Sequence, residues 1–306
     1  MPRTTIPRRA VLVAVTALAV LGVVRASVPA AGAGRYANPQ LLIETDEAAR
    51  LLGAPGVRLV DLRSGMTGGV VYRVGHVPGA VHLDAGELDD PAANAEGFPI
   101  RPAAAAALFG RLGIDQDTIV VAYDEGGSVQ AARLFFVLEY YGHEHVRVLN
   151  GGFGKWRREG RPAESAAPTV APRRFEPRAR REAVATAAEV RASLGKPEAC
   201  LIDARSPAEF TAADQGSRRG GHIPGAANIE WTSTLNPDGT FKDADALQAL
   251  FGAAGARPDR TAMVYCGSGM RSAQDYLALR LIGVRVRNYD ASWMEWGSTP
   301  ALPVEK

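Results

Sequence analysis

The sequence predicts an α/β protein of two tandem domains, each a parallel sheet with helices on both faces. The chain repeats its own motifs after about 142 residues, which indicates a duplicated domain. Within each repeat, short β-branched runs alternate with helical segments, the pattern of a parallel sheet covered by helices. With 306 residues, of which 46% are hydrophobic and 22% charged, the chain is long enough for two such domains.

The motifs of the first copy recur in the second copy in the same order. They are a strand that ends in Asp-x-Arg, a Gly-His-(Val/Ile)-Pro-Gly-Ala turn, a second strand before a glycine-bearing loop, and two aromatic residues three positions apart. The strand that ends in Asp-x-Arg lies at 57–64 and again at 199–206, and the Gly-His turn lies at 75–80 and 221–226. The second strand lies at 118–124 and 261–266, and the aromatic pair is Phe153/Trp156 and Trp293/Trp296.

Capping residues and glycines predict where the helices begin and end. Thr45 opens a helix that ends near Gly53, and the capping box Thr186-Ala-Ala-Glu189 opens another. Two longer helices, at 128–141 and 271–282, each end at a glycine. Buried strands are predicted at 201–202, 263–265 and 284–286.

These patterns divide the chain into four segments. Residues 1–33 are predicted to be a signal peptide, 38–162 an N-terminal domain, 163–181 a linker and 182–306 a C-terminal domain. The linker prediction rests on three prolines among alanine and arginine, without apolar periodicity.

The first 33 residues have the layout of a secretory signal. Arg3, Arg8 and Arg9 precede an uncharged apolar run at 10–24, and Ala31-Gly32-Ala33 offers a cleavage site. The run is short for a membrane span, which needs about 20 residues. We therefore expect export to the periplasm or the exterior, with an uncleaved N-terminal anchor as the alternative. Both the general secretory route and the twin-arginine route stay open.

Removal of the predicted signal changes the net charge. The whole chain has a formal charge of +2, but residues 1–33 hold four arginines and no acid, which leaves 31 basic against 33 acidic residues in the remainder. A protein of this charge has no overall attraction to nucleic acid, and we expect neither nucleic-acid binding nor stable membrane contact after cleavage.

The two cysteines are expected to play different parts. Cys200 stands at the start of its predicted strand, whereas Cys266 follows the end of another strand. At a rise of about 3.3 Å per residue, the two thiols lie too far apart for a disulfide in a parallel sheet. We therefore expect two free thiols, with Cys200 structural. The chain shows no spacing typical of zinc ligands, and no metal or organic cofactor is expected.

Cys266 is the predicted nucleophile. It opens the loop Cys266-Gly267-Ser268-Gly269-Met270-Arg271 at the end of a strand, where open parallel sheets bind their ligands. A loop with two glycines before a helix can turn several amide N–H groups inward and so bind an anion. This environment, together with the positive charge of Arg271, favours the thiolate, the reactive form of a cysteine.

The combination of these motifs resembles the two-domain rhodaneses, the thiosulfate and 3-mercaptopyruvate sulfurtransferases, over residues 38–303. The resemblance implies that the C-terminal half is active and that the N-terminal half is an inactive copy, since Asp124 takes the place of Cys266. It further implies that Arg205 and a second arginine, Arg218 or preferably Arg219, hold the anionic part of the sulfur donor.

The resemblance also implies the reaction and leaves the donor open. Cys266 would carry sulfur as a persulfide from thiosulfate or 3-mercaptopyruvate to cyanide or a small thiol. Gly267 and Ser268 match the mercaptopyruvate type, whereas the charge of Arg271 suits thiosulfate. Two alternatives are a cysteine-dependent phosphatase or arsenate reductase and a non-catalytic module that binds persulfides or anions. The first needs a longer loop than the four residues between Cys266 and Arg271, and the second predicts a missing cysteine.

Overall fold

The computed structural model describes Met1, Pro2 and residues 34–63, 68–90, 99–213 and 219–306. Residues 3–33 of the predicted signal (1–33) and Arg218 lie outside these residues. The fold described here belongs to the compact unit Ala33–Lys306. No helix in the described ranges has the length and apolar character needed to cross a membrane.

The N-terminal half contains a sheet of five parallel strands in the order β1-β5-β4-β2-β3. Its strands are β1 (Leu42–Ile43), β2 (Val57–Asp61), β3 (Val81–His82), β4 (Ile119–Tyr123) and β5 (Val146–Leu149). Its α-helices are α1 (Thr45–Arg50), α2 (Gly68–Val74), α3 (Pro102–Arg111), α4 (Val129–Tyr140) and α5 (Gly152–Arg158). Two 3-10 helices, η1 (Pro39–Leu41) and η2 (Ala85–Leu88), complete it.

The C-terminal half repeats this plan with four parallel strands in the order β7-β6-β8-β9. Its strands are β6 (Ala199–Asp203), β7 (Ala227–Asn228), β8 (Thr261–Tyr265) and β9 (Arg285–Asn288). Its α-helices are α6 (Ala187–Ser193), α7 (Pro207–Phe210), α8 (Ala244–Ala253), α9 (Met270–Leu281) and α10 (Ser292–Trp296). The 3-10 helices are η3 (Arg181–Ala183) and η4 (Trp231–Thr234).

The register of the central strands confirms the duplication. Val57 of β2 lies opposite Ile119 of β4, and Ala199 of β6 lies opposite Thr261 of β8, each pair shifted by 142 residues. The predicted class, two parallel sheets flanked by helices, is therefore confirmed. The strand predicted at 284–286 begins one residue later, because the Val284 amide donates to the Leu279 carbonyl and still belongs to the end of α9.

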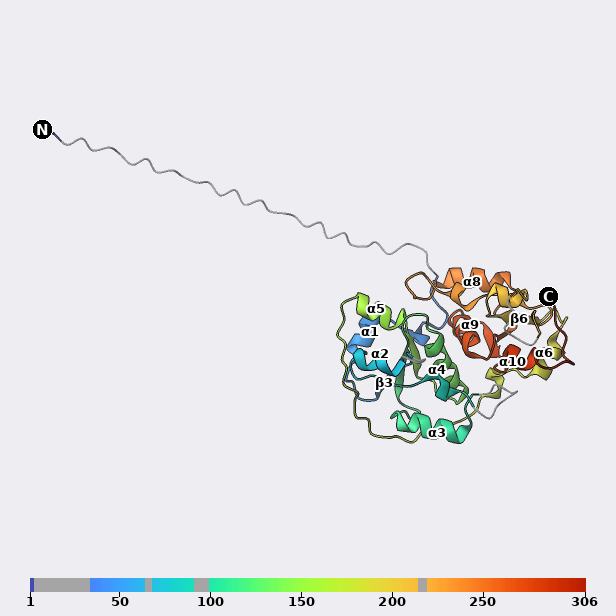
Figure 1. Cartoon of the computed structure of the whole chain (residues 1–306), viewed down its shortest axis with the longest axis horizontal. Helices are drawn as coiled ribbons and strands as arrows, with labels where there is room; N and C mark the ends of the chain where they lie inside the picture. The colour runs from blue at the N-terminus through green and yellow to red at the C-terminus, as the bar shows by residue number, and fades with distance from the viewer. Residues whose placement is uncertain (3–33, 64–67, 91–98, 214–218) are drawn as a thin grey trace. The chain divides into compact units, whose positions relative to one another are not determined.

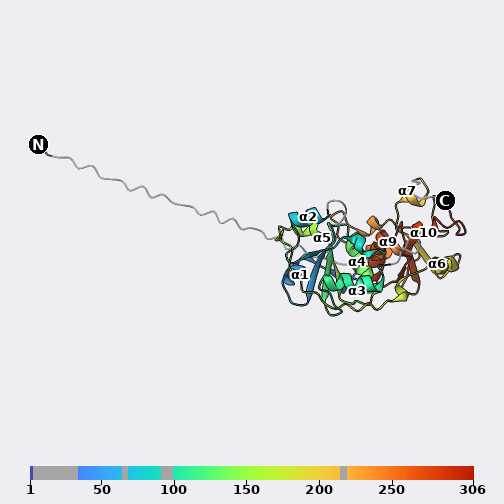
Figure 2. The ribbon, with the colours of Figure 1, turned by 60° about the horizontal axis from the view of Figure 1, so that its bottom comes forward.

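Side chains of successive strand residues enter cores on opposite faces of each sheet. Val60 and Val264 face a core that both halves share, whereas Leu59 and Met263 face the outer core of their own half. The shared core contains α4 and α9, which lie side by side in Figures 1 and 2. These two helices hold the halves together, and each begins at the loop that follows the central strand of its sheet.

The segment between the halves, 163–180, contains no helix and no β-strand longer than an isolated bridge at Glu164. Its backbone is hydrogen-bonded to the N-terminal half at four points: Glu164 pairs with His76, and the amides of Arg173, Arg178 and Arg180 donate to the carbonyls of Gly110, Tyr141 and Tyr140. It therefore follows the surface of the N-terminal half before η3 begins.

Candidate active site

Cys266 follows the last residue of β8 at the C-terminal edge of the sheet. Its side chain is buried, with 1% of the residue surface exposed. The chain turns through Gly267 and Ser268, and Gly269 caps α9 with φ of 84°, the left-handed region that favours glycine. A side chain at Gly269 would also collide with Asp290, since a Cβ there would lie 2.7 Å from the Asp290 carbonyl oxygen. The predicted strand, loop and helix around Cys266 are all present.

Ser292 fixes the shape of this loop. Its buried hydroxyl accepts hydrogen bonds from the amides of Cys266 (3.0 Å) and Gly269 (3.1 Å) and donates to the Tyr289 carbonyl (2.8 Å). Its φ of 54° is uncommon for a residue with a side chain and is a form of local strain. This backbone strain occurs at a residue whose hydroxyl accepts hydrogen bonds from two loop amides.

The remaining amides of the loop are free to bind an anion. In the described part of the chain, no group accepts a hydrogen bond from the amides of Gly267, Ser268, Met270 or Arg271. Free N–H groups at a helix start carry partial positive charge. The loop therefore offers an unfilled set of donors next to a cysteine side chain.

The N-terminal copy shows what such a loop binds. Asp124 stands where Cys266 stands in the other half, and its buried carboxylate accepts four amide hydrogen bonds from the loop and the first turn of α4. The donors and distances are Gly126 (3.0 Å), Ser128 (2.9 Å), Gln130 (3.0 Å) and Ala131 (3.3 Å). The position of Ser292 is taken here by Gly152, which has no hydroxyl. In this copy the loop amides therefore bind an anion of the protein itself, the carboxylate of Asp124.

Arg271 forms a bidentate ion pair with Glu209 of α7. Its Nη1 and Nη2 donate to the two carboxylate oxygens at 2.6 and 2.8 Å. The pair raises the pKa of Arg271, with a further contribution from Cys266, and lowers the pKa of Glu209 to about 2. Arg271 is predicted to bind the anionic sulfur donor. Its positive charge is thus largely balanced by the carboxylate of Glu209.

Arg205 is buried and paired with Asp203, the last residue of β6. Its Nε and Nη2 donate to the carboxylate at 3.0 and 2.6 Å, and Nη2 also donates to the Gly221 carbonyl at 2.8 Å. The guanidinium lies 4.4 Å from the ring centre of Trp293. Burial, which lowers the pKa of Arg205, is outweighed by its bonds to Asp203, so its pKa is raised. Among the described residues, no protein group accepts a hydrogen bond from Nη1, which leaves this donor for an anion.

Arg219 holds the C-terminal segment of the chain. Its guanidinium donates to the carbonyls of Trp296, Gly297, Thr299 and Leu302 at 2.8–3.0 Å. The structure therefore places Arg205, Arg271 and the loop amides around the Cys266 end of the sheet, and it gives Arg219 a structural task. The part of Arg219 in donor binding stays a prediction.

Cys200 differs from Cys266 in its surroundings. It lies in β6 with its side chain in the shared core, where the thiol contacts the Ala254 carbonyl at 3.3 Å. Burial raises the pKa of Cys200 to about 11. Both cysteines are free, as predicted, and Cys200 is suited to packing.

Sequence reasoning missed several residues of this site. Glu209 completes a capping box with Ser206, a signal that the sequence Ser-Pro-Ala-Glu carries. Ser292 and Asp290 gave no such signal, because their roles depend on the fold. Asp275 of α9 is buried with neither oxygen hydrogen-bonded, and burial followed by the charge of Cys266 raises its pKa well above the usual range. No group of three His, Cys, Asp or Glu side chains in the described ranges is arranged to hold a metal ion.

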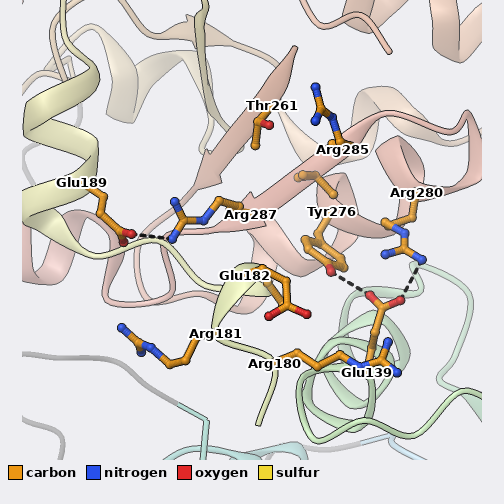
Figure 3. Close-up of a pocket in the computed structure, with 12 residues that line it drawn as sticks. Glu139, Arg180, Arg181, Glu182, Glu189, Thr261, Tyr276, Arg280, Arg285 and Arg287 are labelled. Atoms are coloured by element: carbon orange, nitrogen blue, oxygen red, sulfur yellow. Dashed lines mark hydrogen bonds and ion pairs between the residues drawn. The ribbon is translucent and has the colours of Figure 1, made fainter. Parts of the chain in front are cut away.

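Two pockets lie away from Cys266. One, of about 610 Å³, opens beside Asp124 in the N-terminal half and is lined by Arg63, Glu125 and Phe153. The other, of about 580 Å³, lies between α4 and α9 near Thr261, at the opposite end of β8. Figure 3 shows two ion pairs among its lining residues, Arg287 with Glu189 and Arg280 with Glu139. Neither pocket contains the predicted nucleophile.

Comparison with known proteins identifies the family. The model of the rhodanese-like domain matches twice, over residues 44–159 and 186–299. The chain is 36% identical to the sulfur carrier protein TtuD of Thermus thermophilus, covering 89% of this chain and 98% of that protein. It is 35% identical to a thiosulfate sulfurtransferase of Corynebacterium glutamicum (88% and 92% covered) and 34% identical to the 3-mercaptopyruvate sulfurtransferase of Escherichia coli (86% and 97%).

The solved structures agree with these relatives. The crystal structure of SseA from Escherichia coli superposes with a TM-score of 0.75 at 33% identity, covering 83% of this chain and 98% of that chain. The chain belongs to the rhodanese-like family, as a tandem of two such domains. It is a sulfurtransferase, and the resemblance seen in its motifs is confirmed.

Proposed function

We propose that Cys266 carries the transferred sulfur atom as a persulfide, taken from thiosulfate or 3-mercaptopyruvate and passed to cyanide or a small thiol. The relatives named for these donors motivate the choice of substrates. The observation that carries the proposal is the pair of loops. The N-terminal loop binds an internal carboxylate through four amides, whereas the C-terminal loop has free amides and a cysteine in the same place.

The proposed reaction has two half-reactions. The Cys266 thiolate attacks the outer sulfur of thiosulfate, an S–S bond forms to Cys266, and the donor's S–S bond breaks with its electron pair leaving on sulfite. With 3-mercaptopyruvate the C–S bond breaks instead, and the proton of the donor thiol ends on carbon to give pyruvate. Cyanide then attacks the outer sulfur, thiocyanate leaves, and the thiolate returns.

The free amides stabilise the persulfide anion between the half-reactions. A persulfide extends the Cys266 side chain by one sulfur atom, which brings negative charge toward the loop donors that the Asp124 carboxylate uses in the other copy. We assign to Arg205 Nη1, which has no protein acceptor among the described residues, the binding of the oxygen atoms of the sulfur donor.

Steady-state sulfur transfer to cyanide tests the proposal, with thiosulfate and 3-mercaptopyruvate assayed side by side. Cys266→Ser should abolish transfer from either donor, since no thiolate remains to accept sulfur. Cys200→Ser is the matched control and should keep most of the activity. Full activity in Cys266→Ser would overturn the proposal.

The two alternatives are less well supported by the site. A phosphatase would use a free arginine to bind the equatorial oxygens of phosphate, but Arg271 is held by both oxygens of Glu209. A module that only binds anions needs no thiol, whereas Cys266 is present at the end of β8 beside unfilled donors.

We also propose that the protein is exported, on the basis of the arginine-flanked apolar run at 10–24 and Ala31-Gly32-Ala33. N-terminal sequencing of the protein from its producing cell should find a start near Gly34. Full-length protein recovered from the cytosol would contradict export.

A further inference from the structure

The N-terminal half contributes a buried arginine to the floor of the Cys266 loop. Arg133, in the middle of α4, extends out of its own half and donates to both carboxylate oxygens of Asp290, at 2.5 Å from Nη1 and 2.9 Å from Nη2. Arg133 is 1% exposed and Asp290 is fully buried. Asp89 of the N-terminal half accepts a second bond from Nη2 at 2.7 Å. A bidentate pair without solvent fixes both partners in position.

Asp290 is in direct contact with the loop. The Gly269 Cα packs against the Asp290 carboxylate and carbonyl so closely that a side chain would not fit. Asn288 donates to Asp290 Oδ1 at 2.8 Å, and Asp290 lies two residues before Ser292, which binds the amides of Cys266 and Gly269. Contact with the carboxylate of Asp290 therefore fixes the position of the loop and of the first residues of α9.

We propose that Arg133 is a positioning residue for the Cys266 loop, so that the copy without a cysteine completes the active site of the other half. This inference rests on the proposed function of Cys266. The equivalent place on α9 is Gln274, which among the described residues makes one side-chain hydrogen bond, to Thr234 of its own half at 3.3 Å.

The same pair of helices supplies a matched control. Glu139 lies six residues after Arg133 on α4, about 9 Å further along the helix. It accepts bonds from Tyr276 at 2.7 Å and Arg280 at 2.9 Å, both on α9, as Figure 3 shows. Loss of Glu139 breaks a partly buried ionic contact between the halves without touching the loop.

The test compares Arg133→Met with Glu139→Gln in the full chain. Three quantities are measured: the melting temperature, kcat and KM for sulfur transfer, and the pH profile for alkylation of Cys266 by iodoacetamide. We expect both variants to lower the melting temperature. Arg133→Met alone should lower kcat at least tenfold, change KM less than threefold, and move the alkylation profile to higher pH by about one unit, a tenfold change in the thiolate equilibrium.

Equal kcat and equal alkylation profiles in the two variants would overturn the inference. Alkylation needs no sulfur donor, so an inactive parent protein would refute the proposed function and leave this comparison intact. If Arg133→Met does not fold, Arg133→Lys keeps the charge and loses the bidentate contact. An intermediate loss of kcat in Arg133→Lys would support the inference, and parental kcat together with a parental alkylation profile would contradict it.

Discussion

Arg205 combines an observed structural role with a proposed role in binding the sulfur donor. Its guanidinium donates to Asp203 and the Gly221 carbonyl, yet Nη1 donates to no protein acceptor among the described residues. Arg63 makes the same contacts with Asp61 and Gly75 in the N-terminal half, at 2.6 Å each from Nη2. The same arginine–aspartate ion pair therefore occurs twice in the duplicated fold, near Cys266 in the C-terminal half and without a nearby cysteine in the N-terminal half.

This duplication separates the two roles of Arg205 by experiment. Arg205→Ala leaves Asp203 buried without its partner and should cost about 3–5 kcal/mol of unfolding free energy. It should also raise KM for the anionic donor by roughly tenfold to a hundredfold, the loss of one charged contact. Arg63→Ala should cost similar stability and leave KM unchanged. Donor kinetics that respond equally to both variants would show that Arg205 acts on the fold alone.

Some residues could be predicted from the sequence and others could not, for a physical reason. Cys266, Asp124 and the loop glycines stand beside motifs that repeat, so their places at the strand ends could be predicted. Arg133 and Asp290 are 157 residues apart and meet only because α4 and α9 pack. That Arg219 and Arg271 donate to protein acceptors could not be predicted either, because the sequence shows an arginine's charge and not its hydrogen-bond partners.

At the scale of elements, the strand-loop-helix units of the two halves differ in whether their amides are occupied. In the N-terminal unit, β4 and α4 enclose the carboxylate of Asp124, and in the C-terminal unit β8 and α9 leave the amides free. The unit itself could be predicted from alternating periodicity, a capping glycine and a helix end at glycine. Which amides are filled depends on side-chain position and needed the structure.

Replacement of Asp124 tests whether the loop is an anion site. In Asp124→Ala, four amides lose their acceptor, which should lower the unfolding free energy by about 3 kcal/mol. Sulfate or thiosulfate should restore part of this loss by binding the empty loop, so that the melting temperature rises with anion concentration. Glu125→Ala removes the same charge from the exposed neighbour and should show neither effect. Equal anion dependence in both variants would argue against the loop as an anion site.

At the scale of the whole molecule, the two halves share one hydrophobic core. His143, which follows the C-terminal end of α4, lies in the N-terminal half with 1% of its surface exposed. Burial lowers the pKa of His143 to about 4, against 6.5 for an ordinary histidine. The folded protein therefore favours neutral His143, and this contribution is complete above pH 6.5 and is lost as the pH falls toward 4.

The acid sensitivity gives a prediction for the intact protein. As the pH falls from 7 to 4, protonation of His143 in the unfolded chain should lower the unfolding free energy by on the order of 3 kcal/mol. The reason is that His143 binds a proton at a higher pH in the unfolded chain than in the folded protein. His143→Leu should flatten the dependence of unfolding free energy on pH in this range, as measured by urea unfolding. An unchanged pH dependence in His143→Leu would contradict the assignment of a neutral buried histidine.

The persulfide on Cys266 is the central claim, and mass spectrometry of the donor-treated protein tests it most directly. The protein is incubated with thiosulfate or 3-mercaptopyruvate without an acceptor, digested under non-reducing conditions, and its cysteine peptides are weighed. The Cys266 peptide should gain about 32 Da, one sulfur atom, and should lose this mass when cyanide is added. The Cys200 peptide should stay unmodified, because burial raises the pKa of Cys200 to about 11 and keeps its thiol protonated. Added sulfur on Cys200, or none on Cys266 while transfer proceeds, would contradict this account.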